Sequence, residues 1–266
     1  MAGYDVHVQI LVDGSDANTA GQAVGTASRL TADYATNLVV EAFARRGRGL
    51  YAPVDFQPRI WYNPDLISSK FLIPGLIGFI IALTAVISTS LTVVREKERG
   101  TMEQLMVSPL RPVQIVIGKT VPYIAISLVA ATAILILGYL LFDVQVKGSL
   151  LLLYVAILTI VLGALGQWLL ISTVTDSQQV AFMVSVFSSL LPSFLLSGFI
   201  FPVSSMPVVL QVFSNVAVNK FFLVVVRGVM LKGVGFGAVW QQFVYMVIFT
   251  VVMLGVSIKR MQKRSI

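Results

Sequence analysis

Beyond Lys70 the chain is dominated by long apolar stretches that are separated by short polar segments. The stretches cover about residues 71–94, 115–142, 149–173, 179–201 and 237–258. Each reaches the roughly 20 residues that an α-helix needs to cross the hydrocarbon core of a bilayer. The pattern therefore predicts five transmembrane helices.

The segment 202–236 is also apolar, but proline and charge interrupt it. Pro202 and Pro207 break the run early, and Lys220, Arg227 and Lys232 follow. A charge at the bilayer centre costs roughly 2.5–3.5 kcal/mol on insertion scales, which disfavours a full span through Arg227. We expect a pair of short helices that enter one leaflet and return, with a sixth span as the alternative.

Residues 1–70 have the pattern of a water-exposed domain. Residues 7–13 alternate as in a half-buried strand, and residues 13–18 (DGSDAN) are rich in turn and capping types. Apolar residues then recur at helical spacing from Thr19 to about Glu41, residues 45–49 resemble a loop, and residues 58–64 form a second candidate strand. The expected fold is an all-α polytopic membrane protein with a small α/β extracytoplasmic domain.

Composition supports a membrane protein and excludes several kinds of chemistry. Hydrophobic residues make up 57% and charged residues 12% of the 266 residues, with a mean hydropathy of +0.88. Soluble domains average about 45–50% apolar and about 25% charged residues. Cysteine is absent and His7 is the only histidine, so disulfides, thiolate sites and histidine metal clusters are excluded. We expect no catalytic, metal or cofactor site.

The distribution of charge predicts how the spans are oriented. Residues 95–114 and 259–266 lie on one side in a five-span arrangement and share nine Lys/Arg if Lys119 is counted, against four on the other side. The positive-inside tendency places the richer side in the cytoplasm and residues 1–70 outside. MAGYDVHVQI is neither a signal peptide nor a span, so we expect an original first helix that this chain lacks. Basic residues at span ends argue against nucleic-acid binding.

The most charged part of the chain follows the first apolar stretch. Six charges fall within the nine positions from Arg95 to Glu103. One interpretation is a flank that stops translocation and lies near lipid headgroups. The other rests on the mixed signs and on the stripe of Met102, Leu105 and Met106, which indicates a short amphipathic helix. Such a helix can dock into a protein groove.

Here the sequence resembles the type-2 ABC exporter permeases, in the drug-efflux branch. The resemblance rests on VREKERGTMEQLMVSP and GKTVPY and covers nearly the whole chain. Further matching segments are VQILVDGSDANTA, WYNPDLISSKFLIPGLIG, ISTVTDSQQVA, LLSGFIFPVSSMP and VVRGVMLKG. The chain departs from the family at NVAVNKFF (215–222), where a proline is expected before the aromatic residues.

The resemblance implies a permease subunit of an ATP-driven exporter, without an ATPase site of its own. Residues 1–70 would be extracytoplasmic, and residues 71–266 would form the permease domain with a cytoplasmic coupling segment (95–114). The expected coupling residues are Arg95, Glu96, Lys97, Glu98, Arg99, Gly100, Thr101, Glu103 and Leu105. The expected outer gate, in region 202–236, comprises Pro202, Pro207, Arg227 and Lys232.

The implied partners follow from the same resemblance. They are an ATP-binding subunit that carries Mg-ATP, a second permease chain in a homo- or heterodimer, a periplasmic adaptor, and the lipids of a bacterial inner membrane. Export of drugs or other amphipathic compounds is the leading hypothesis, with polysaccharide or lipid export as an alternative. A membrane scaffold or receptor without transport activity is another alternative. GKT (118–120) is not a phosphate loop, because Val113 stands where that motif requires glycine.

Overall fold

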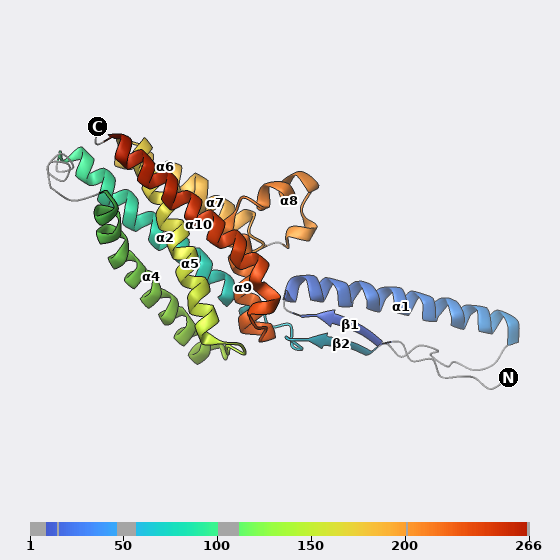
Figure 1. The fold of residues 1–266 in the computed structure, drawn as a ribbon. Helices are drawn as coiled ribbons and strands as arrows, with labels where there is room; N and C mark the ends of the chain where they lie inside the picture. The colour runs from blue at the N-terminus through green and yellow to red at the C-terminus, as the bar shows by residue number, and fades with distance from the viewer. Residues whose placement is uncertain (1–8, 15, 47–56, 101–111, 201, 265–266) are drawn as a thin grey trace. The chain divides into compact units, whose positions relative to one another are not determined.

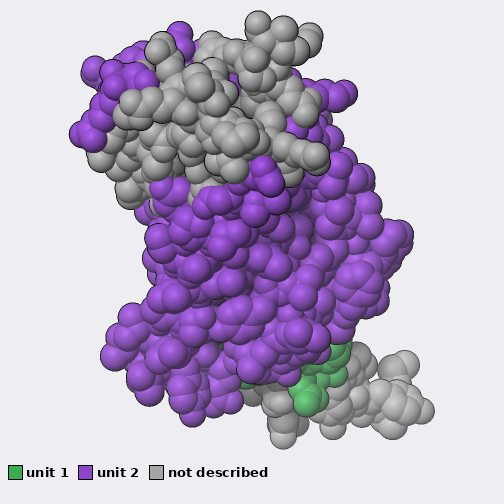
Figure 2. Space-filling model, turned by 60° about the vertical axis from the view of Figure 1, so that its left-hand side comes forward, with its two compact units in different colours: residues 1–71 green, residues 72–266 purple. Residues whose placement is uncertain are grey.

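The computed structural model describes residues 9–14, 16–46, 57–100, 112–200 and 202–264. The described chain is mostly helical, with one two-stranded sheet. It divides into two compact units, Met1–Phe71 and Leu72–Ile266, which Figure 2 colours separately.

The first unit is built on a strand–helix–strand segment. Strands β1 (Gln9–Asp13) and β2 (Gln57–Trp61) pair in parallel, with Gln9 opposite Gln57 and Asp13 opposite Trp61. Helix α1 (Ala17–Arg46) connects the two strands. Such a long connection is expected, because parallel strands cannot be joined by a short turn. The two predicted strands and the predicted helix are confirmed.

The turn from β1 into α1 is set by two residues of the predicted capping segment. A Cβ on Gly14 would lie 2.6 Å from the carbonyl oxygen of Trp61, so only glycine lets the two strand ends approach. Asp16 Oδ1 accepts hydrogen bonds from the backbone N–H groups of Asn18 (3.0 Å) and Thr19 (3.2 Å). The carboxylate thus satisfies N–H groups that the first turn of a helix leaves without partners.

One prediction for this unit is wrong. Arg45 and Arg46 were assigned to a loop, but they form the end of α1. The residues of this last turn, including Ala44 and both arginines, favour helix, and no glycine occurs until Gly47. The remaining residues of the predicted loop, 47–49, lie outside the described residues.

Long helices run alongside one another in the rest of the chain (Figure 1). They are α2 (Ser68–Glu98), α4 (Pro112–Phe142), α5 (Leu150–Val174) and α10 (Phe236–Arg264), together with α6 (Gln178–Ser185), which continues through a π-helical turn, η1 (Val186–Leu190), into α7 (Leu191–Leu195).

Four helical segments of the described chain are long and apolar enough to cross a membrane. They are Thr120–Phe142, Leu150–Val174, Gln178–Leu195 and Phe236–Arg260, and the count becomes five only if the bent pair Val208–Ser214 and Val218–Lys232 is a single span. These four match predicted spans. The predicted first span, 71–94, falls within α2, whose described apolar part is Ser68–Thr84.

The interrupted region between α7 and α10 contains short helices, as predicted. A 3-10 turn, η2 (Val203–Ser205), precedes α8 (Val208–Ser214), and α9 (Val218–Arg227) continues into a π-helical turn, η3 (Gly228–Lys232). The helices on either side of the break at residues 215–217 are bent by 84°. Helix α8 accordingly turns away from the long helices in Figure 1. The bend therefore forms at Asn215–Ala217 without the proline that the family resemblance led us to expect.

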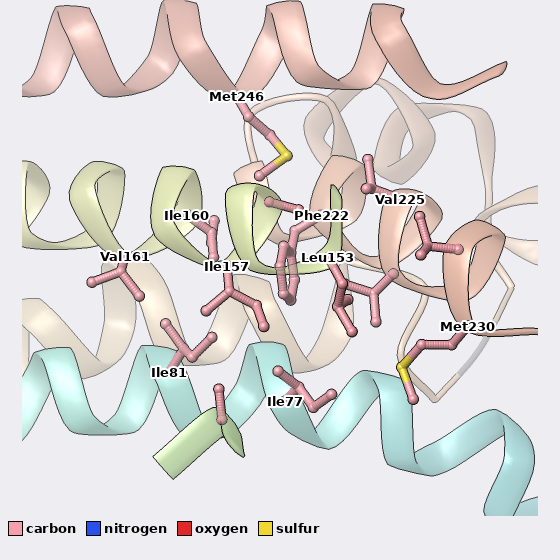
Figure 3. Packing of buried hydrophobic residues seen from close by; sticks show 14 of the residues in the cluster. Ile77, Ile81, Leu153, Ile157, Ile160, Val161, Phe222, Val225, Met230 and Met246 are labelled. Atoms are coloured by element: carbon pink, nitrogen blue, oxygen red, sulfur yellow. The ribbon is translucent and has the colours of Figure 1, made fainter. Parts of the chain in front are cut away.

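Helix α5 is the centre of the packing. Its buried residues Leu153 and Ile157 lie in one apolar cluster with Ile77 of α2 and Phe222 of α9 (Figure 3). On another face, Gly166 allows α10 to approach closely, because a Cβ there would lie 3.0 Å from the backbone nitrogen of Leu254. Small residues of this kind let membrane helices pack tightly, and hydrogen bonds between helices add to the contact. Ser257 Oγ of α10 donates to the Gly166 carbonyl at 2.7 Å.

Candidate coupling and gate sites

The end of α2 is joined to the start of α6 by a carboxylate. Glu98, the last residue of α2, accepts a hydrogen bond at Oε1 from the backbone N–H of Gln178, at 2.7 Å. The second oxygen, Oε2, accepts from the Gln178 side-chain amide. Eighty residues separate the two partners in sequence, so the pair connects two helices directly.

The position of Gln178 explains why a carboxylate suits this contact. Gln178 is the first residue of α6, and Ser177 before it gives no side-chain capping bond. The first N–H groups of a helix lack intrahelical partners and carry partial positive charge. Glu98 supplies both an acceptor and a negative charge from another helix. The Glu98 side chain of α2 therefore acts as the N-terminal cap of α6.

The other predicted coupling residues are only partly within the described structure. Arg95, Glu96 and Lys97 form the last turn of α2 before Glu98. Arg99 is exposed, and Gly100 has a φ of +70°, a left-handed conformation that favours glycine just beyond a helix end. Thr101, Glu103 and Leu105, and with them the predicted amphipathic helix, lie outside the described residues.

The two prolines of the predicted gate stand at helix starts. Pro202 precedes η2 and Pro207 precedes α8. Their carbonyls accept the first backbone bonds of those turns, from Ser205 (3.0 Å) and Gln211 (3.1 Å). Proline is favoured near the beginning of a helix because its φ is already helical and no N–H is required there.

Arg227 contacts the backbone that follows α7. Its Nη1 donates to the Gly198 carbonyl at 3.0 Å, and its Nη2 donates to the Phe199 carbonyl at 3.3 Å. Gly198 has a φ of +82°, a left-handed conformation that favours glycine. The guanidinium thereby holds the end of the α6–α7 helix against α9. Lys232, the last predicted gate residue, ends η3 before Gly233, whose φ is +67°.

An aromatic cluster lies beside this turn. Phe199 is stacked on Phe79 of α2, with ring centroids 6.1 Å apart, and meets Phe194 of α7 edge-on at 6.0 Å. Gly75 of α2 provides the room, because a Cβ there would lie 2.1 Å from the Phe199 ring. Aromatic pairs in such arrangements contribute about 0.5–1.5 kcal/mol beyond their buried area. The contacts of Arg227 and Phe199 thus fix one end of α7 to both α2 and α9.

Sequence analysis missed the residues that accept or complement these contacts. Gln178 lies in ISTVTDSQQVA, which was noted only for its family resemblance, and Gly75 and Gly198 were not singled out. Single polar residues carry no periodic signal, so their partners become apparent only when the fold brings them together. Among the described residues, no three His, Cys, Asp or Glu side chains come together as a metal site.

The long apolar helices and their glycine-mediated packing define a multi-pass membrane protein. The chain belongs to the ABC-2 transporter family, because the family profile described as "ABC-2 family transporter protein" matches residues 1–259.

Curated relatives agree with this family. "Probable multidrug ABC transporter permease YbhR" of Escherichia coli K12 is 34% identical over 243 residues, which are 91% of this chain and 64% of that protein. "Probable multidrug ABC transporter permease YbhS" of the same strain is 33% identical over 226 residues, 85% of this chain and 59% of that protein. "Inner membrane transport permease YhhJ" is 26% identical over 251 residues, 91% of this chain and 64% of that protein. The chain thus spans somewhat less than two thirds of the length of these relatives.

Proposed function

We propose that this chain is the membrane permease part of an ATP-driven exporter of drugs or other amphipathic compounds. ATP would be bound and hydrolysed by a separate subunit. The YbhR and YbhS relatives are named as probable multidrug permeases, which supports drugs as the cargo, and membership of the ABC-2 family supports an ATP-binding partner. We further propose that two permease chains pair, with a periplasmic adaptor as an additional partner, in a bacterial inner membrane.

The Glu98–Gln178 pair is the observation that most supports a coupling role for residues 95–114. A segment that only stops translocation needs positive charge beside the bilayer and has no need of a carboxylate bonded to another helix. Glu98 instead attaches this segment to the helix that continues through η1 and α7. Movement of the segment by an ATPase would therefore be passed to α6 directly.

The remaining topology belongs to the same proposal. Five spans would place residues 1–70 outside the cell, and the segment 95–114 and the C-terminus in the cytoplasm. The bent pair α8–α9 would be a re-entrant pair in the outer leaflet. Pro202, Pro207, Arg227 and Lys232 would form the outer gate, with Arg227 holding the α7 end in place.

Co-purification with an ATP-binding subunit tests this function. The chain is co-expressed with a candidate ABC ATP-binding subunit from the same organism, purified by a tag on the permease and assayed for ATP hydrolysis. We expect a stable complex whose ATPase rate rises with an amphipathic dye such as ethidium. Leu105→Asp should reduce this stimulation without lowering expression, because it places a charge on the apolar stripe expected to dock. Glu103→Gln should do the same through lost charge complementarity. No associated ATPase, or full stimulation in both variants, would contradict the proposal.

A further inference from the structure

A cavity of about 460 Å³ lies inside the second unit, between α2, α5, α7, the α8–α9 bend and α10. Its volume falls within the range of about 300–1,000 Å³ found for small-molecule sites. Its walls are mainly apolar and include Ile81, Ile160, Leu210, Phe213, Phe249 and Met253. No charged residue is among the described residues that line it.

The polar part of the wall begins at a break in helical bonding. Pro192 has no N–H, so the carbonyl of Ser188, four residues earlier, loses its usual helical donor. The π-helical turn η1 ends at Leu190, two residues before this proline. Gln167 of α5 donates from Nε2 to the Ser188 carbonyl at 3.3 Å. The Ser188 carbonyl can only accept a hydrogen bond, so the NH2 group of the Gln167 amide must face it. The amide oxygen, Oε1, therefore points away from Ser188.

A second amide lies in the same wall. Asn219, at the start of α9, is 6% exposed and donates from Nδ2 to Ser193 Oγ. Within the described part of the chain, neither Gln167 Oε1 nor Asn219 Oδ1 has a hydrogen-bond donor. Neither oxygen is among the fully buried polar atoms without a partner, so each remains accessible to a donor on a ligand, which would form a hydrogen bond there.

We propose that this cavity binds a small amphipathic molecule that has an apolar body and at least one hydrogen-bond donor, such as an amino or hydroxyl group. The donor would bond to the amide oxygens of Gln167 and Asn219, and the apolar body would fill the space against α10 and α8. Because the wall lacks carboxylates, the ligand is neutral or carries a delocalised charge. This inference rests on the proposed function for its claim that such a ligand is the exported compound.

Ethidium is a suitable probe because it combines a flat apolar ring system, a delocalised charge and two amino groups. The native chain has no cysteine, so a Ser189→Cys variant places one thiol in the cavity wall. We expect saturating ethidium to slow alkylation of that thiol by N-ethylmaleimide at least fivefold in the detergent-purified chain. A Ser204→Cys variant, exposed and outside the cavity, serves as the control and should react at an unchanged rate.

The hydrogen-bond donor is tested with the same phenanthridinium lacking its amino groups. We expect it to protect Ser189→Cys about tenfold more weakly, as the loss of one buried hydrogen bond implies. Ethidium should also bind Gln167→Leu about tenfold more weakly than Gln241→Leu, the same substitution on an exposed face of α10. If Gln167→Leu does not fold, the protection measured with Ser189→Cys and Ser204→Cys still tests whether ethidium binds in the cavity.

Three results would overturn the inference: no protection of Ser189→Cys by ethidium, equal protection by the analogue without amino groups, or equal protection by phospholipid. The last result would identify a space filled by acyl chains. Neither ATP nor an ATPase is present in these measurements. Failure here therefore leaves the exporter function standing, and failure of ATPase association leaves ligand binding by the cavity standing.

Discussion

Replacing Glu98 by alanine should loosen the connection between α2 and α6. The change removes two hydrogen bonds to a carboxylate, one from the Gln178 backbone N–H and one from its side chain. Hydrogen bonds to charged groups contribute about 1.5–3 kcal/mol each when buried. Glu98 is exposed, so solvent weakens both bonds, and we expect a combined loss of about 1–2 kcal/mol. Glu98→Gln keeps an acceptor but loses the charge at the α6 N-terminus, and should cost about half as much.

The assay is the free energy of unfolding in mixed detergent micelles with increasing dodecyl sulfate. A double-mutant cycle with Gln178→Ala isolates the side-chain bond, since the backbone N–H remains in that variant. We expect a coupling energy of about 0.5–1 kcal/mol between the two positions. Arg99→Gln, at the exposed next position, is the matched control and should leave the free energy of unfolding unchanged. Zero coupling, or equal losses in Glu98→Ala and Arg99→Gln, would refute the reasoning.

Three further predictions concern topology, the outer turn and helix packing. A cysteine at position Ser15 should react with an impermeant thiol reagent in intact cells, whereas one at Ser108 should react only after lysis; labelling of both in intact cells would contradict the five-span topology. Arg227→Leu should insert and express normally but reduce export, because the Gly198 and Phe199 carbonyls lose their hydrogen bonds to the guanidinium. Misinsertion of this variant in a glycosylation-site topology assay would instead assign Arg227 a topological role. Gly166→Leu should destabilise the α5–α10 contact by about 1–3 kcal/mol in the same detergent assay, since Leu254 leaves no room for a side chain, and unchanged stability would contradict this close approach.

Sequence patterns predicted the elements of this fold well, because burial and helix length leave long periodic signals. The apolar runs at 115–142 and 149–173 correspond closely to α4 and α5. The parallel pairing of β1 with β2 was not predicted, since two short strands do not reveal their direction. The end of α1 was also missed, because the arginines before Gly47 suit a helix end as well as a loop.

The sites were less accessible to sequence analysis than the fold. Glu98 was selected for its place in a charged cluster, but its partner Gln178 lies in another segment and has no distinguishing pattern. Arg227 stood out as a charge in an apolar region, whereas its carbonyl partners belong to the backbone and leave no mark in a sequence. The cavity depends on how packing brings Gln167 of α5 and Asn219 of α9 into the same wall. Contacts between single polar residues far apart in the chain are therefore the part that needs a structure.

ATP-driven uptake of ethidium by inside-out vesicles tests the central claim most directly. The vesicles contain this chain together with its ATP-binding subunit, and uptake is followed by fluorescence after addition of Mg-ATP or a non-hydrolysable analogue. The account predicts uptake with Mg-ATP that is absent with the analogue and strongly reduced in Glu98→Ala, even where the complex still assembles. Uptake that is equal with both nucleotides, or a complex that hydrolyses ATP without any uptake, would contradict it.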